Sequence, residues 1–151
     1  MTIRLATPDD APEVARLLHD FNTEYDDFTP GVEVLTENAR QMLADGDMVV
    51  LLAGAGPDGL AELRFRRSVW TLKLDAYLEE LYVVPGLRGQ GIGRRLMREA
   101  MDVAREKGAA RIELGTSEDD TAAVALYESE GFTNRESKPD GPTMFFYERD
   151  L

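Results

Sequence analysis

Apolar residues recur three and four positions apart in two early segments of the chain, which is the spacing of a helix that buries one face. The first segment follows Thr7, a favourable N-cap residue, with Pro8 at the first helical position. The second segment follows Pro30-Gly31 and ends before Asp45-Gly46. The two predicted apolar stripes are Val14, Leu17, Leu18 and Phe21, and then Val32, Leu35, Ala39 and Met42.

Short apolar or alternating segments predict strands between and after these helices. Apolar and charged residues alternate in Leu60–Arg67, as in a strand with one exposed face, and Pro85 ends the strand Tyr77–Val84. Further strands are expected at Ile3–Ala6, Met48–Ala53, Ile112–Thr116 and Met144–Glu148, and further helices at Ile92–Lys107 and Asp120–Glu130. The order βααβββαβαβ indicates an α/β fold in which a mixed sheet carries helices on its faces.

The composition is that of an ordinary globular protein, with 151 residues, 43% hydrophobic and 30% charged. This length fits a single domain over residues 1–151. The sequence has neither an apolar run long enough to span a membrane nor the pattern of a signal peptide. It contains no cysteine, which excludes disulfides, thiolate metal sites and a cysteine nucleophile. A cytoplasmic location is therefore the simplest expectation.

The net charge of −12 makes nucleic acids and anionic membranes unfavourable partners. Such an excess of acidic residues favours either of two interpretations. It increases solubility, or it gives the protein a preference for cationic ligands. No cluster of residues has the spacing of a metal site, and the single histidine, His19, is expected on the surface of the first helix rather than in catalysis. No metal is expected.

A glycine-rich turn joins the strand Tyr77–Val84 to the helix that begins at Ile92. Its alternate glycines, Gly89, Gly91 and Gly93, allow backbone N–H groups to converge at the positive end of the helix dipole. Four arginines add positive charge in an otherwise acidic chain: Arg88, Arg94, Arg95 and Arg98. The turn therefore predicts a site for a multiply anionic ligand, although a glycine turn with surface arginines is the simpler alternative. Its spacing fits neither the P-loop nor the dinucleotide fingerprint.

Two segments of the sequence resemble landmarks of one family. The segment from Arg88 to Gly93, RGQGIG, is similar to the R/Q-x-x-G-x-G/A signature of the GNAT superfamily of N-acetyltransferases. The segment from Ala123 to Phe132 resembles the family's second landmark, A-x-x-L-Y-x-x-x-G-F. The two landmarks and their strands cover Tyr77 to Phe132, and the element order fits the family over nearly the whole chain. The resemblance implies a GNAT-like, mostly antiparallel sheet of six to seven strands with about four helices on its faces.

The resemblance also implies an activity. A GNAT protein would transfer the acetyl group of acetyl-CoA to a primary amine, on a small molecule or a peptide, by direct attack. Three alternatives stay open: another acyl donor or a hydroxyl acceptor, a non-catalytic module that binds acyl-CoA as a sensor or scaffold, and an anion site for some other nucleotide. A small-molecule or peptide amine is the expected partner, and a homodimer is left open.

By analogy with the family, residues of two regions would bind the acyl donor and carry the chemistry. Tyr127 would protonate the departing thiolate, and Glu80, rather than its neighbour Glu79, would remove the proton of the amine. Asp120 replaces an asparagine that contacts the cofactor in many relatives, and an ionised Asp cannot donate a hydrogen bond. The backbone of one strand would hold the pantetheine arm and the turn would hold the phosphates: Tyr82, Val83, Val84, Arg88, Gly89, Gln90, Gly91, Ile92, Gly93 and Arg94.

The acceptor pocket is expected beside the loop between the first two helices. This loop mixes aromatic residues with carboxylates, which suits a cationic amine through charge and cation–π contacts. A polar surface loop is the alternative. The expected acceptor-site residues are Phe21, Glu24, Tyr25, Asp26 and Phe28, with Tyr77 and Trp70 from the turn region between the third and fourth strands.

Overall fold

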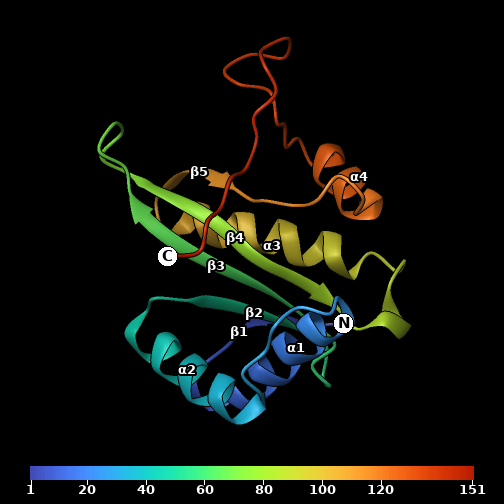
Figure 1. The fold of residues 1–151 in the computed structure, drawn as a ribbon. Coiled ribbons are helices and arrows are strands. Elements are labelled where there is room, and N and C mark those ends of the chain that lie inside the picture. The colour runs from blue at the N-terminus through green and yellow to red at the C-terminus, as the bar shows by residue number, and fades with distance from the viewer. The chain divides into compact units, whose positions relative to one another are not determined.

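The computed structural model describes all residues, 1–151, and divides into two compact units, Met1–Leu114 and Gly115–Leu151. The first unit holds most of the regular structure (Figure 1). Its helices are α1 (Ala11–Glu24), α2 (Val32–Asp45) and α3 (Ile92–Glu106), with short 3₁₀ turns at Pro8–Asp10 and Pro85–Leu87. Its strands are β1 (Ile3–Leu5), β2 (Val49–Ala53), β3 (Gly59–Arg67), β4 (Leu74–Val83) and β5 (Ala109–Glu113).

The five strands form one mixed sheet in the order β1-β2-β3-β4-β5. The pairs from β1 to β4 are antiparallel, and β4 and β5 are parallel. This confirms the predicted mixed, mostly antiparallel sheet with helices on its faces, with five strands in place of the expected six to seven. The strand β5 begins at Ala109, three residues before the predicted Ile112–Thr116, because Gly108, at a φ of 90°, turns the chain directly from α3 into the sheet.

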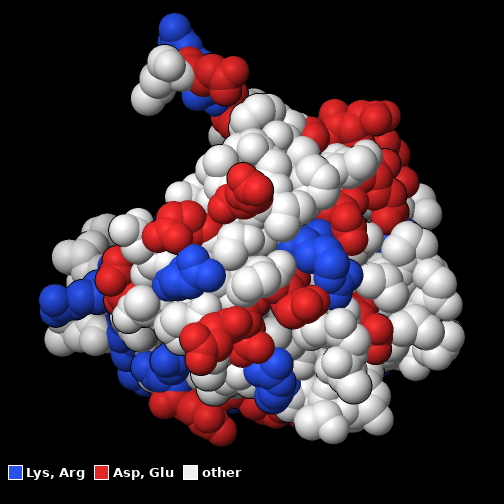
Figure 2. All heavy atoms as spheres, turned by 90° about the horizontal axis from the view of Figure 1, so that it is seen from below, with Lys and Arg blue, Asp and Glu red and all other residues white.

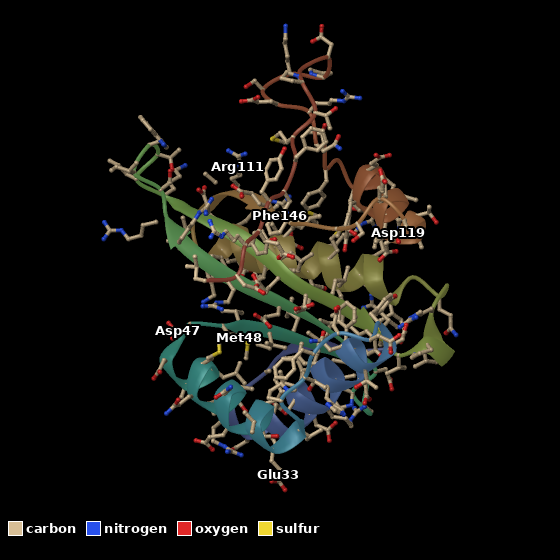
Figure 3. All side chains as sticks on the ribbon, viewed as in Figure 1. Glu33, Asp47, Met48, Arg111, Asp119 and Phe146 are labelled. Atoms are coloured by element: carbon tan, nitrogen blue, oxygen red, sulfur yellow. The ribbon has the colours of Figure 1, made fainter.

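Helices cover both faces of this sheet: α1 and α2 lie on one side, and α3 lies on the other (Figure 1). The α1/α2 face holds a buried cluster that includes Val14, Leu17, Val50, Leu60 and Tyr82. On the opposite face, α3 buries Leu96, Met97, Ala100 and Ala104. In Figure 3, Met48 lies beside α2 on the inner side, where it is buried, whereas Glu33 points away from the same helix. The predicted stripes of α1 and α3 are therefore the buried faces of these helices.

The entry into α1 is held by charged side chains of the N-terminal segment. Asp10 accepts a hydrogen bond from the backbone N–H of Thr7 at 2.8 Å and two from Arg4, each at 2.8 Å. These donors hold the pKa of Asp10 well below its ordinary value, the Arg4 guanidinium contributing most. Thr7 thus ends the first strand segment, as its capping chemistry predicts, although a 3₁₀ turn precedes the regular helix.

The hairpin between β3 and β4 ends in an exposed apolar tip. Val69, Trp70 and Leu72 are 82, 91 and 93% exposed. A hydrogen bond from Ser68 N–H to the carbonyl of Lys73 closes the tip, and Leu72 has a φ of 60°. Trp70 was expected beside the acceptor pocket; its side chain instead lies in solvent at the end of the hairpin.

The second unit contains one helix, α4 (Thr121–Ser129). Asp120 is its N-cap, with its side chain accepting a hydrogen bond from Ala123 N–H at 3.1 Å. The predicted strand Met144–Glu148 is wrong: beyond α4 only an isolated bridge joins Arg135 to Thr143. Phe145, Phe146 and Tyr147 are more than 70% exposed. A strand needs a partner along its length for its backbone groups; here the N–H of Met144 donates to the carbonyl of Asn134, but no ladder continues from it.

Candidate active site

The turn from β4 into α3 has the backbone that the glycine pattern predicts. Gly89 and Gly91 have φ values of 78° and 83°, in the left-handed region that favours glycine, and Gly91 is the N-cap of α3. The first hydrogen bond of the helix runs from Arg95 N–H to the carbonyl of Gly91. The N–H groups of the preceding residues, Ile92 to Arg94, therefore have no acceptor within the helix. Because the space above Gly89 and Gly91 is open, this donor set fits a pyrophosphate.

The strand β4 leads into this turn with one edge free of β5. Pairing between β4 and β5 ends at Tyr77 and Glu113, so β5 does not pair with Leu78–Val83. The other edge of this stretch stays paired with β3 up to Val83 and Gly59. An extended ligand could pair along this free edge, and the pantetheine arm at Tyr82 and Val83 stays a prediction; the carbonyl of Val83 accepts a hydrogen bond from Arg88. The N–H of Val84, however, donates to the carbonyl of Asp58.

A bulge in β4 lies at Glu79. Glu62 of β3 is opposite Glu80, but Leu63 is opposite Leu78, so Glu79 has no partner across the ladder. The bulge re-aims Glu80, which shares a face with Tyr82 on the α1/α2 side of the sheet.

Glu80 lies among other carboxylates. Burial raises its pKa to about 7, and the charges of Glu79 and Asp27 add to this effect. Asp27 comes from the loop between α1 and α2, next to the predicted Asp26, which has a φ of 55°. A carboxyl group with a pKa near 7 is well suited to accept a proton at neutral pH.

Glu62 is the residue that the sequence-based reasoning missed. It is only 6% exposed, and burial together with the charges of Glu80 and Glu79 raises its pKa to about 7. In the alternating pattern of Leu60–Arg67 it falls on the face that was expected to be exposed. The signal that could have found Glu62 is its position two residues after Leu60. Residues two apart in a strand share a face, and Leu60 is fully buried.

Two residues with different predicted roles form one ion pair. Glu24, expected in the acceptor pocket, accepts two hydrogen bonds from Arg88, expected in the phosphate cradle, at 2.7 and 2.8 Å. Arg88 also donates to the carbonyl of Val83 at 2.8 Å and lies over the Tyr82 ring. The guanidinium lowers the pKa of Glu24. This pair joins the end of α1 to the glycine turn.

Aromatic rings support this pair from the α1 side. The Phe21 ring stacks on Tyr82 with centroids 4.9 Å apart and meets the edge of Tyr25 at 5.4 Å. Phe28 is 83% exposed in the following loop, and its carbonyl accepts a hydrogen bond from Asn22. Phe21 therefore packs against the core, whereas Tyr25 and Phe28 are exposed.

Further along the sheet, Tyr77 lines a shallow hollow with Arg64, Asp75 and Glu113. Burial and the charges of Glu79, Glu113 and Glu80 raise the pKa of its hydroxyl. On the face shown in Figure 2, acidic groups form separate clusters with basic groups between them. The hollow and the carboxylates around Glu80 could bind a cationic group.

Tyr127 and Asp120 belong to the second unit. The backbone carbonyl of Tyr127 accepts a hydrogen bond from Phe132 N–H at 3.0 Å, and the two rings are 6.1 Å apart. The Asp120 side chain caps α4, which is the capping role that an aspartate can fill at this position. No group of three or more His, Asp or Glu side chains is arranged to hold a metal ion, and none of the helices is both long and apolar enough to cross a membrane.

The profile of the acetyltransferase (GNAT) family matches residues 14–132. The chain belongs to the GNAT family of acetyltransferases. Streptothricin acetyltransferase of Streptomyces lavendulae is 33% identical over 83% of this chain, and the thialysine N-ε-acetyltransferase of Sus scrofa is 30% identical over 85% of it. The match covers 59% of the first relative and 82% of the second. For the mycothiol acetyltransferase of Beutenbergia cavernae the match covers only 23% of the relative.

Solved structures agree with the GNAT assignment. A protein of Arthrobacter sp. FB24 assigned to the acetyltransferases is 45% identical, with a TM-score of 0.92, and the match covers all of this chain and 96% of that one. An aminoglycoside acetyltransferase from a soil metagenome, solved with sisomicin, has a TM-score of 0.77 at 19% identity and covers 99% of this chain and 96% of its own. The second similarity concerns the fold alone.

Proposed function

We propose that this GNAT protein transfers the acetyl group of acetyl-CoA to a primary amine. The observation that carries the proposal is the course of β4: the same strand bears Glu80, exposes a free edge, and runs into the glycine turn at the N-terminus of α3. An anionic ligand at the turn and a base on the strand are thereby combined in one segment. Bound acetyl-CoA would supply an activated acetyl thioester.

Glu80 is the proposed base. A primary amine is mostly protonated near neutrality, because its pKa is about 10. The N–H bond of the ammonium breaks, its proton passes to the carboxylate of Glu80, and the freed nitrogen lone pair attacks the thioester carbonyl. As the C–S bond breaks, the thiolate takes a proton, which the family analogy assigns to Tyr127.

The proposed acceptor is cationic. Glu62, Glu79 and Glu80 on the sheet and Asp27 in the adjacent loop attract an ammonium group. Two relatives are named for acting on streptothricin and on the ε-amine of thialysine, which supports an amine acceptor without identifying it. A cytoplasmic location and one functional domain over residues 1–151 stay predictions, and a homodimer is left open.

The test combines a binding and a turnover measurement. Calorimetry should detect CoA binding to the wild type and none to Gly91→Asp, in which a side chain and a negative charge enter the cradle. A panel of amines with acetyl-CoA should release free thiol, and Glu80→Gln should lower kcat by about 10²–10⁴-fold without loss of CoA binding. Tyr127→Phe should act on kcat in the same way. Binding of CoA with no thiol release for any amine would favour the sensor or scaffold alternative, and no binding at all would refute the proposal.

A further inference from the structure

Glu62 and Glu80 are direct neighbours across the β3/β4 ladder. Residues directly opposite one another in an antiparallel pair carry their side chains on the same face, with Cβ atoms about 4.5–5.5 Å apart. Two carboxyl groups of this length can therefore meet. Like charges at this position repel one another when both are ionised.

The surroundings of this carboxyl pair disfavour ionisation of both groups at once. On one side Glu62 is opposite Val50 of β2, and the opposed residues Leu60 and Tyr82 lie next to the pair on the same face. The charged groups that act on the pair are Glu79 on the bulge, Asp27 from the α1–α2 loop and Arg64 on β3. Arg64 alone opposes the acidic groups.

We propose that Glu62 is a positioning residue that shares one proton with Glu80, so that the pair carries a single negative charge near neutral pH. This inference rests on the proposed role of Glu80 as the base. Glu62 is 94% removed from solvent and faces a second carboxyl, so its ionised form is stabilised less well than that of an exposed carboxylate. Sharing the proton satisfies both groups in one hydrogen bond and fixes the orientation of Glu80.

The pair has a chemical consequence for the reaction. When the ammonium N–H bond breaks, the proton passes to Glu80 of the pair in its doubly ionised form, and the pair returns to its singly charged, proton-sharing form. It returns the proton to water after the amide has formed and the product has left. Glu62 itself forms no bond to the substrate; repulsion between its charge and that of Glu80 makes the doubly ionised pair a stronger base than an isolated carboxylate.

The first test does not depend on activity. In protein labelled with ¹³C at the glutamate side-chain carboxyl, NMR titration should reveal two coupled signals, identified by their loss in Glu62→Gln and Glu80→Gln. In Glu62→Gln the midpoint of Glu80 should fall by about one pH unit or more, the separation typical of coupled sites. Glu37→Gln, which removes an exposed carboxylate of α2, is the control and should leave the midpoint of Glu80 unchanged. An unchanged midpoint in Glu62→Gln would overturn the proposal.

The second test measures the role of the pair in turnover. The acidic limb of the kcat/KM profile should move to lower pH in Glu62→Gln, with a lower plateau in kcat, little change in KM for the amine, and partial recovery in Glu62→Asp. A change in thermal stability with an unmoved pH profile would leave Glu62 a purely structural residue and refute its role. If the NMR coupling is present but Glu80→Gln turns over normally, Glu80 is not the base and the proposed function fails while the shared proton stands.

Discussion

Glu24 and Glu62 lie at the edge of the same buried cluster, yet their environments are opposite. Glu24 accepts two short hydrogen bonds from Arg88, and its pKa is lowered. Glu62 faces Glu80, and its pKa is raised to about 7. Both approach Tyr82, one through a hydrogen bond from its hydroxyl and the other along the sheet. Burial raises the pKa of both carboxyls; at Glu62 the charge of Glu80 adds to this effect, whereas at Glu24 the Arg88 guanidinium outweighs it.

The difference separates two uses of an acidic residue. The charge of Glu24 is fixed over the working pH range and ties α1 to the glycine turn. The charge of Glu62 and Glu80 changes near neutrality, which is what a proton acceptor requires. Substituting Glu24 and Glu62 separately therefore reveals which carboxyl stabilises the fold and which one destabilises it.

The largest effect is expected for Glu62→Gln at alkaline pH. A raised pKa means that the folded state holds a proton that the unfolded state loses between pH 4.5 and about 7, so wild-type stability falls over this interval. The variant escapes this loss. Its free energy of unfolding should exceed that of the wild type by about 2 kcal/mol at pH 8, reduced from the roughly 3 kcal/mol of the full shift because the pair keeps some hydration, and should equal it at pH 4.

Denaturant titrations at the two pH values measure this difference. Glu37→Gln is the control, since Glu37 is an exposed residue of α2 and its loss should change stability by less than about 0.5 kcal/mol. A Glu62→Gln variant that is less stable than the wild type at pH 8 would mean that the folded protein binds the ionised carboxylate of Glu62 favourably. The contrast drawn between Glu62 and Glu24 would then be wrong.

Glu24→Gln should lower the free energy of unfolding, and by less than Glu62→Gln raises it. Removing the charge leaves Arg88 without its carboxylate and should cost about 0.5–1 kcal/mol at pH 7, the range of a partly exposed ion pair. Because the pKa of Glu24 is lowered, its contribution is present above pH 4.5 and disappears as the pH falls through the folded-state pKa, so the two proteins should converge in acid.

The Asp102–Arg105 pair on α3 provides the control for this measurement. Its side chains are 64 and 68% exposed, so Asp102→Asn should change the free energy of unfolding by close to zero. The cost of Glu24→Gln should also shrink at about 1 M salt, where charges are screened within about 3 Å. A cost that persists in strong acid would show that Glu24 acts through packing rather than charge.

The smallest effect concerns the acyl donor. All three guanidinium nitrogens of Arg88 donate to Glu24 or to Val83, and the cradle itself consists of backbone N–H groups. Arg88→Gln should therefore weaken CoA binding by only about threefold, less than 1 kcal/mol. Glu24→Gln should strengthen binding by a similar factor, because a negative charge beside the turn is lost. Calorimetry that finds a loss of tenfold or more for Arg88→Gln would assign a direct phosphate contact to its side chain.

Local signals in the sequence predicted much of this fold. The glycine turn and the apolar stripe placed the start of α3 at Ile92, and the hydrophobic pattern found both N-terminal helices. The strand at Met144–Glu148 failed because pairing is a property of two segments, and its own composition carries no record of a missing partner. Glu62 escaped because alternation assigns faces without telling whether a helix covers the second one. The Glu24–Arg88 pair joins residues 64 positions apart, beyond any local pattern.

The exposed tip of the β3–β4 hairpin has a practical consequence, because Trp70 is the only tryptophan of the chain. Its indole ring already lies in water in the native state, so its emission should be red-shifted before any denaturant is added. Unfolding should then change the emission maximum little, while far-UV circular dichroism follows the loss of the helices. A blue shift in the folded protein would instead signal that another surface has covered the hairpin, which makes this one ring a built-in probe of association at its tip.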